Sequence, residues 1–441
     1  VVDRAKARED EGGVRIFCGE VPGADEGRKI EVLAFDKNRV DGGSIGEAEV
    51  AAVGGEDDRG VGDRAGLGFE LADEESVEGG KRFDRIREFG LLKALGMKPG
   101  LWITIGAATG DAKVYKDHPE WFVKNSSGEH GNIHGYGDDF YTTCYGTGWV
   151  DYIKDVIVRM TQEYGLAYTK LDFAIATSAY VNDPRISGCY ATDHPFHRDH
   201  QESFWVIYKR VLELFDRLHE QCPDLFIDCT FETAGKLQLM DYAVANHADG
   251  NWLSNFEEPV PTGPLRIRQM AWWRSPAVPA SSLVIGNTPM DDPGFEFALK
   301  SLIGTLPIVL GDPREIPIEK RAEIKAWSIW MQEMQEKYDY MSYRRDRPGF
   351  GEPREGSWDG WMRINNDTKK GGGIGVFRQG ALENSRHLYV KGLNPDLEYL
   401  VKLAPEGIEV HRASGGDLMN EGFQVEIQEA YDGMIYEIGV L

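Results

Sequence analysis

The sequence has few cysteines, no long apolar run and too few basic residues to balance its acids. The five cysteines form no Cys-x-x-Cys pair, so neither a disulfide framework nor a zinc site is indicated. No apolar run approaches the ~18 residues that a membrane span requires. With 49 Lys and Arg against 73 Asp and Glu, the formal net charge is −24. Nucleic acids and anionic membrane surfaces would repel such a chain, whereas a neutral substrate such as a sugar would not.

The chain length predicts more than one domain. At 441 residues the chain exceeds one typical hydrophobic core, so we expect one large domain and a smaller one. The first residue is Val1, which is compatible with removal of a signal peptide or of a whole N-terminal domain. The sequence does not distinguish a secreted, periplasmic or cytoplasmic protein, and it leaves an oligomer possible.

Residues 1–340 are predicted to form an α/β domain, a (β/α)8 barrel of the TIM type. Short apolar runs alternate there with helical patterns, as βα units do. The six predicted strands are Gly100–Ile105, Ala167–Phe173, Leu225–Cys229, Val244–Asp249, Ser282–Gly286 and Thr305–Leu310. Two amphipathic helices are expected over Trp149–Tyr164 and Ser203–Gln221. Residues 1–80 are poorly patterned, and two further strands near Val14–Cys18 and Val50–Gly54 would close the barrel.

Residues 341–441 are predicted to form a C-terminal antiparallel β-sandwich. Short strand-like runs replace the helical patterns after Tyr340, with Gly and Pro turns between them. The clearest runs are Gly373–Phe377, His387–Val390, Tyr399–Leu403 and Met434–Ile438.

Asp172 is the first candidate for catalysis. It ends the predicted strand Tyr168-Thr-Lys-Leu-Asp-Phe173, and acids at the C-terminal ends of barrel strands usually belong to the active site. Lys170 lies two residues earlier, so both side chains point to the same face of the strand. A cation there favours the ionised carboxylate that a nucleophile needs. The alternative is a buried ion pair that fills a layer of the barrel.

Asp249 is the second candidate. It ends the predicted strand Val244–Asp249 and is followed by Asn251 and Trp252, a set of side chains suited to sugar recognition. Asp249-Gly250 is also typical of a simple turn. Glu232, three residues after the strand ending at Cys229, competes for the role of proton donor. Two carboxylates that face one cavity are the minimum apparatus for cleaving a glycosidic bond.

A histidine-rich segment offers a weaker signal. His194, His197 and His200 alternate with acidic residues before a predicted helix, and a metal-dependent hydrolase could use them. Their spacing matches no familiar zinc site, so a solvated loop is the favoured interpretation and no metal site is predicted.

Several segments together resemble the melibiase-like retaining α-galactosidases of glycoside hydrolase family 36. These are Gly96–Trp102, His118–Phe122, Tyr168–Phe173 and the pair Asp57-Asp58. The resemblance implies that Asp172 is the nucleophile, Asp249 the acid/base and Lys170 a substrate contact. It also implies that Asp57 and Asp58 bind sugar hydroxyls and that a cysteine-bearing strand end, here Cys229, lies beside the sugar.

The chain departs from the family pattern at several sugar contacts. Lys236 stands where the family has arginine, in the segment Cys229-Thr-Phe-Glu-Thr-Ala-Gly-Lys236. In the family a Trp-Asp pair normally follows the Asp-Asp pair. That Trp-Asp is absent here, and Asp63 is followed by Arg64. The large N-terminal β-sandwich domain usual in the family is missing from this chain. These departures concern the identity of the sugar more than the reaction.

The resulting prediction is retaining hydrolysis of a terminal α-linked sugar, with α-galactoside as the substrate class that the resemblance implies. No cofactor is required. Trp102, Lys170, Glu232, Lys236 and Trp252 are expected to shape the sugar subsite together with the Asp57-Asp58 pair and Cys229. Three alternatives remain: a catalytically inactive carbohydrate-binding barrel, a hydrolase or transglycosylase for another α-linked sugar, and the metal-dependent hydrolase.

Overall fold

The computed structural model describes residues 89–90, 92–94, 97–132, 140–172, 174, 188–229, 242–252, 258–285, 294–308, 317–342 and 351–441. The described residues up to Trp252 belong to one compact unit, and those from Glu258 onward belong to a second. Both strands predicted before residue 80, together with Asp57 and Asp58, lie outside the described residues. None of the helices in these ranges is long and apolar enough to cross a membrane.

Four parallel strands form the main sheet of the first unit, in the order β1-β4-β5-β6. Its elements are β1 (Gly100–Thr104), β2 (Ala107–Thr109), α2 (Lys113–Asp117), η1 (Pro119–Trp121), β3 (Phe140–Thr142), α3 (Trp149–Tyr164), β4 (Tyr168–Asp172), α4 (His200–Gln221), β5 (Phe226–Cys229), α5 (Tyr242–His247) and β6 (Gly250–Trp252). A small antiparallel hairpin, β2 with β3, lies within the connection from β1 to α3. Parallel strands joined through helices are the βα units expected of a TIM-type fold.

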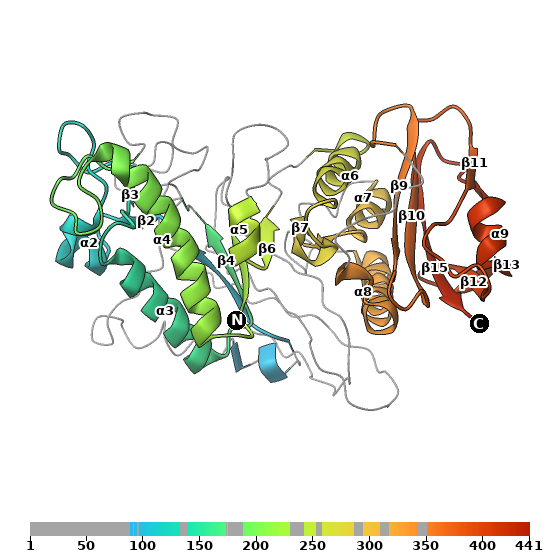
Figure 1. Cartoon of the computed structure of the whole chain (residues 1–441), viewed down its shortest axis with the longest axis horizontal. Coiled ribbons are helices and arrows are strands. Elements are labelled where there is room, and N and C mark those ends of the chain that lie inside the picture. The colour runs from blue at the N-terminus through green and yellow to red at the C-terminus, as the bar shows by residue number, and fades with distance from the viewer. Residues whose placement is uncertain are drawn as a thin grey trace. The chain divides into compact units, whose positions relative to one another are not determined.

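Helices α3 and α4 lie side by side in Figure 1 and cover one face of these strands. Helix α3 ends at Gly165, which has a φ of 67° and donates its N–H to the carbonyl of Thr161. Helix α4 begins after Asp199, whose carboxylate accepts the N–H of Glu202 at 2.9 Å. The apolar stripes of both helices share one core with alternate strand residues, namely Leu101, Ile103, Leu171, Ile227 and Cys229.

The second unit contains two parallel strands followed by antiparallel sheets. Its elements are α6 (Thr262–Arg274), η3 (Ala280–Ser282), β7 (Leu283–Ile285), α7 (Phe295–Leu302), β8 (Leu306–Pro307), α8 (Ile318–Tyr338), η4 (Tyr340–Ser342), β9 (Ser357–Ile364), β10 (Gly371–Gln379), β11 (Ser385–Leu388), β12 (Glu398–Leu403), β13 (Ile408–Ser414), α9 (Gly415–Asn420), β14 (Phe423–Glu426) and β15 (Tyr431–Val440). Strand β7 pairs with β8, and five strands form an antiparallel sheet in the order β13-β12-β15-β10-β9. Strands β11 and β14 pair separately but contribute to the same hydrophobic core.

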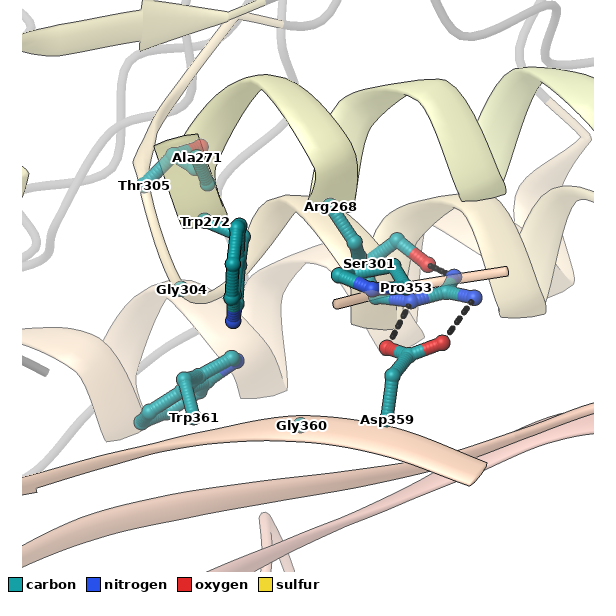
Figure 2. Close-up of a pocket in the computed structure, with 10 residues that line it drawn as sticks. All are labelled: Arg268, Ala271, Trp272, Ser301, Gly304, Thr305, Pro353, Asp359, Gly360 and Trp361. Atoms are coloured by element: carbon teal, nitrogen blue, oxygen red, sulfur yellow. Dashed lines mark hydrogen bonds and ion pairs between the residues drawn. The ribbon is translucent and has the colours of Figure 1, made fainter. Parts of the chain in front are cut away.

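A buried ion pair joins the helices of the second unit to its five-stranded sheet. Arg268 of α6 donates two hydrogen bonds to Asp359 of β9, at 2.7 and 3.1 Å, and further bonds to Ser301 and Gln379. Figure 2 shows the Arg268 guanidinium facing the Asp359 carboxylate in a pocket that Trp272 and Trp361 also line. These buried polar groups form their hydrogen bonds with one another. We therefore interpret the pocket as part of the packing of this unit and not as a sugar-binding site.

The predicted strands compare well with the structure, with one exception. β1, β4, β5, β7 and β8 confirm five of the six predicted barrel strands, and α3 and α4 confirm both helices. The predicted strand Val244–Asp249 is wrong: Tyr242–His247 is helix α5, and the strand begins only at Gly250. After residue 340 three predicted runs fall within β10, β12 and β15, the run His387–Val390 overlaps β11 only at His387 and Leu388, and antiparallel sheets are present there.

Candidate functional site

A polar cluster occupies the strand face opposite the helices. The strand register places Trp102 of β1 beside Lys170 of β4, and Lys170 beside Asp228 of β5. Paired residues in a parallel sheet point the same way, and residues two apart share a face. Tyr168, Asp172 and Trp252 therefore point to this face as well, while the apolar residues between them point to α3 and α4. We call Trp102, Tyr168, Lys170, Asp172, Asp228 and Trp252 the inner cluster.

Asp172 is the last residue of β4, as the sequence predicts for an active-site acid. The indole Nε1 of Trp102 donates to its Oδ2 at 2.9 Å, and Nζ of Lys170 lies 3.7 Å from the same oxygen. The carboxylate side chain is 11% exposed and the lysine side chain 7%. Both contacts fix the orientation of the Asp172 carboxylate at the C-terminal end of the strand.

Lys170 also contacts an aromatic ring. Its Nζ lies 3.8 Å from the centroid of the Trp252 ring, at the end of β6. A lysine between a carboxylate and an indole face is held by charge on one side and by the ring quadrupole on the other. The structure therefore brings together four of the residues predicted from the sequence: Trp102, Lys170, Asp172 and Trp252.

Asp228 is a member of the inner cluster that the sequence reasoning missed. It is fully buried, and the hydroxyl of Tyr168 donates to its Oδ2 at 2.6 Å. Burial raises the pKa of Asp228 to about 7, although Tyr168 and Lys170 act in the opposite direction. The signal was present: Asp228 is an acid within the apolar run Leu225–Cys229, one residue before the strand ends, and such an acid belongs to a polar inner face.

We predict that Asp228→Asn flattens the dependence of stability on pH. The carboxyl has a higher pKa folded than unfolded, so its contribution to stability is fully present below about pH 4 and is lost as the pH rises through about 7. The amide keeps an acceptor for Tyr168 and does not ionise. Between pH 5 and 7.5 the wild-type melting temperature should fall more steeply than that of the variant, by an amount worth on the order of 2 kcal/mol. Parallel curves would contradict the raised pKa.

The structure does not bring Asp249 together with Asp172. Asp249 comes just before β6, at its N-terminal end, and accepts hydrogen bonds from His219 Nε2 of α4 and from the N–H of Ile227, both at 2.8 Å. Asp249 lies beside Ile227 of β5, which pairs with Thr169 of β4, three residues before Asp172. Asp249 is therefore displaced from Asp172 by three residues along the strands and by two strands across the sheet. At ~3.3 Å per residue and ~4.8 Å per strand, the two aspartate backbones lie roughly 14 Å apart. A retaining glycosidase holds its carboxyl groups about 5–5.5 Å apart.

Asp249→Asn should affect stability and leave turnover within about tenfold of wild type. The carboxylate caps the start of β5 and pairs with His219, whose pKa it raises. A raised histidine pKa supports the fold below about pH 6.5, and this support is lost as the pH rises through the folded value. NMR titration of His219 should show its pKa fall in the variant. A complete loss of activity with normal folding would instead return Asp249 to the chemistry.

Cys229 does not face the inner cluster. It pairs with Leu171 and is fully buried among the residues that pack under α3 and α4. This position corrects the expectation that Cys229 contacts the sugar through its side chain, because the alternation of the strand turns it away. Glu232, Lys236, Asp57 and Asp58 lie outside the described residues, so their assignments stay predictions.

The fold and the inner cluster together define an α/β protein of parallel strands with an acid at a strand's C-terminal end. The family model named Melibiase matches residues 55–284, which are 230 of the 441 residues. The chain belongs to the melibiase family. This match confirms the resemblance on which the sequence analysis relied.

Solved structures share the fold at low sequence identity. The GH36 α-galactosidases AgaA and AgaB from Geobacillus stearothermophilus both superpose with a TM-score of 0.62 at 15% identity. Each comparison covers 80% of this chain and 46% of theirs. The α-galactosidase from Lactobacillus brevis gives a TM-score of 0.61 at 16% identity, over 81% of this chain and 46% of that one. The chain thus spans about half the length of these proteins. No curated protein matches the chain.

Proposed function

We propose that the protein is a retaining glycoside hydrolase that removes a terminal α-linked sugar, with α-galactosides as its substrates. The observation that carries the proposal is Asp172 at the end of β4, with Trp102 and Lys170 on its carboxylate. Membership of the melibiase family supports the reaction class. AgaA has been solved with raffinose and with stachyose, which supports a sugar substrate of this kind.

In the proposed reaction Asp172 attacks the anomeric carbon and the glycosidic C–O bond breaks. A carboxylic acid on the other side of the sugar protonates the leaving oxygen. The same group, now a carboxylate, takes a proton from water, which attacks the glycosyl–Asp172 ester and releases the sugar with its configuration retained. Lys170 contributes by fixing the orientation of the Asp172 carboxylate for attack, and the ring of Trp252 holds the lysine in place.

The acid/base residue must approach from the same edge of the sheet as Asp172. Asp249 does not, since its carboxylate lies at the opposite end of β6. Glu232, three residues beyond the end of β5, is therefore the better candidate from the sequence analysis.

The proposal also covers the fold of both domains. We propose that two strands before residue 80 complete an eight-stranded barrel, and that the two antiparallel sheets after residue 350 pack as a sandwich. The shared core of β11 and β14 with the five-stranded sheet supports the second point.

The test is a screen of 4-nitrophenyl α- and β-glycosides, followed by NMR of the first product formed. Release from the α-galactoside with initial formation of α-galactose would support the proposal. An initial β-product would indicate an inverting reaction, and release from another α-glycoside would change the sugar but keep the mechanism. Folded protein that binds galactosides without hydrolysing them would favour the carbohydrate-binding alternative.

A further inference from the structure

A second cluster of reactive side chains lies in the first unit, apart from the inner cluster. Cys144, Cys189, His194 and His197 are all buried, and their ligand atoms lie within 4.8 Å of one another. Cys144 Sγ is 3.3 Å from His197 Nε2, and Cys189 Sγ is 3.5 Å from His194 Nδ1. The two histidine nitrogens are 3.1 Å apart. The solvated loop expected from the sequence is therefore wrong for His194 and His197.

These separations match the edges of a tetrahedral zinc site. Zinc binds cysteine sulfur at ~2.3 Å and histidine nitrogen at ~2.0–2.1 Å, so tetrahedral geometry places sulfur about 3.6 Å from nitrogen and the two nitrogens about 3.3 Å apart. The measured values of 3.3, 3.5 and 3.1 Å lie within about 0.3 Å of these edges. Two sulfurs and two nitrogens form a common ligand set of structural zinc.

Neighbouring segments of the chain hold Cys189 and His197 in place. The N–H of Lys124 donates to Cys189 Sγ at 3.4 Å, a contact that stabilises a thiolate ligand. The N–H of Cys189 in turn donates to Ser203 Oγ at 2.8 Å. Gly146 must lack a side chain, because a Cβ there would lie 2.5 Å from Cδ2 of His197. Cys189 and His197 are thus held by neighbours on three segments of the chain.

Without a metal the cluster would be costly to bury. The outer ring nitrogens, Nε2 of His194 and Nδ1 of His197, have no hydrogen-bond partner in the part of the chain that the structure describes. Two buried imidazoles that lack partners on one side need compensation on the other. Bonds from a divalent cation to Nδ1 of His194 and Nε2 of His197 would supply it, and two thiolates would neutralise the charge of the ion.

We propose that Cys144, Cys189, His194 and His197 bind one Zn²⁺ in a closed structural site. Cys144 follows β3 in the connection from β1 to α3, and the other three ligands lie in the connection from β4 to α4. The ion would tie together the two connections that leave the C-terminal ends of β1 and β4, the strands that carry Trp102 and Asp172. Four protein ligands leave no open position for a substrate or water, so the role is structural. His200 is not a ligand, since its ring stacks on Tyr190 with centroids 3.8 Å apart.

The first test needs no variant and no activity. Full-length protein purified under reducing conditions from zinc-supplemented cells should contain about one zinc per chain. X-ray absorption at the zinc edge should show two sulfur ligands at ~2.3 Å and two nitrogen ligands at ~2.0–2.1 Å. Metal-free protein that takes up no Zn²⁺, a shell of oxygen ligands, or a disulfide between Cys144 and Cys189 in the native protein would each overturn the proposal.

The second test compares two cysteine variants. Cys144→Ser should lose zinc to a competing chelator at least tenfold more readily than wild type and melt roughly 10 °C lower, because a site worth several kcal/mol is weakened. Cys222→Ser is the matched control, since Cys222 is also a buried thiol but lies outside the cluster. It should keep its zinc. Retention of zinc by Cys144→Ser, or loss of activity on chelation with unchanged melting, would overturn the structural role.

Discussion

Asp172→Ala should lower turnover of an activated aryl α-galactoside by at least about 10⁴-fold while the protein stays folded. The substitution removes the atom that forms the covalent intermediate, and the remaining acid and binding contacts cannot replace it. The side chain is a strand-end carboxylate that contacts Trp102 and Lys170 and contributes little to the apolar core. Steady-state kinetics and circular dichroism on the same preparation check both parts.

Azide rescue makes the assignment stereochemically testable. In Asp172→Ala, azide can enter from the face that Asp172 occupied and displace the aryl group directly, which gives a β-galactosyl azide. In a variant that lacks the acid/base residue, azide attacks the Asp172 ester and gives the α-azide. Asp249→Asn is the matched control, because it removes another strand-associated carboxylate at the opposite end of the sheet. Near-normal activity in Asp172→Ala would end the proposal for this residue.

The same assay identifies the proton donor. Glu232→Ala and Asp249→Ala are each assayed on a substrate whose leaving group needs no protonation and on one whose leaving group does. The variant that lacks the acid should lose far more activity on the poor leaving group, and only that variant should yield the α-azide. If Glu232→Ala behaves as wild type while Asp249→Ala forms the α-azide, the exclusion of Asp249 from the site is overturned.

Much of the strand framework could be predicted because its signals are local. In the run Tyr168–Asp172 the charged residues Lys170 and Asp172 are two positions apart and alternate with Thr169 and Leu171, so the strand and its charged face both follow from the sequence. The segment Tyr242–His247 shows the limit. Six residues with a short apolar centre fit a strand and a helical turn equally well, and periodicity cannot separate them. Because of this ambiguity, the sequence analysis placed Asp249 at the end of a strand, whereas in the structure it comes just before the start of β6.

The members of a site that come from distant strands are harder to predict. Asp228 joins Lys170 only through the register of β4 and β5, which fixes which residues share a face. Cys144 lies 45 residues before Cys189, within a connection that contains the three-residue strands β2 and β3. No spacing rule links such positions, so the sequence analysis considered His194, His197 and His200 without either cysteine and favoured a solvated loop.

The largest expected effect on stability comes from Asp359→Ala. Asp359 is fully buried and accepts two hydrogen bonds from Arg268, which is also buried. Removing the carboxylate leaves a guanidinium in the interior with its positive charge uncompensated, although Ser301 and Gln379 still accept from it. Breaking a buried pair in this way costs about 3–5 kcal/mol. Calorimetry should show a lower melting temperature for the transition of the second unit.

An exposed ion pair in the same unit provides the control for this prediction. Arg412 also donates two hydrogen bonds to one carboxylate, that of Glu409, at 3.3 Å each, but both side chains are about half exposed. Glu409→Ala should therefore cost no more than about 1 kcal/mol. The double variant Arg268→Met with Asp359→Leu should recover most of the loss, because it removes the stranded charge along with its partner. A double variant as unstable as Asp359→Ala would mean that the ion pair itself, and not the uncompensated charge, holds α6 on β9.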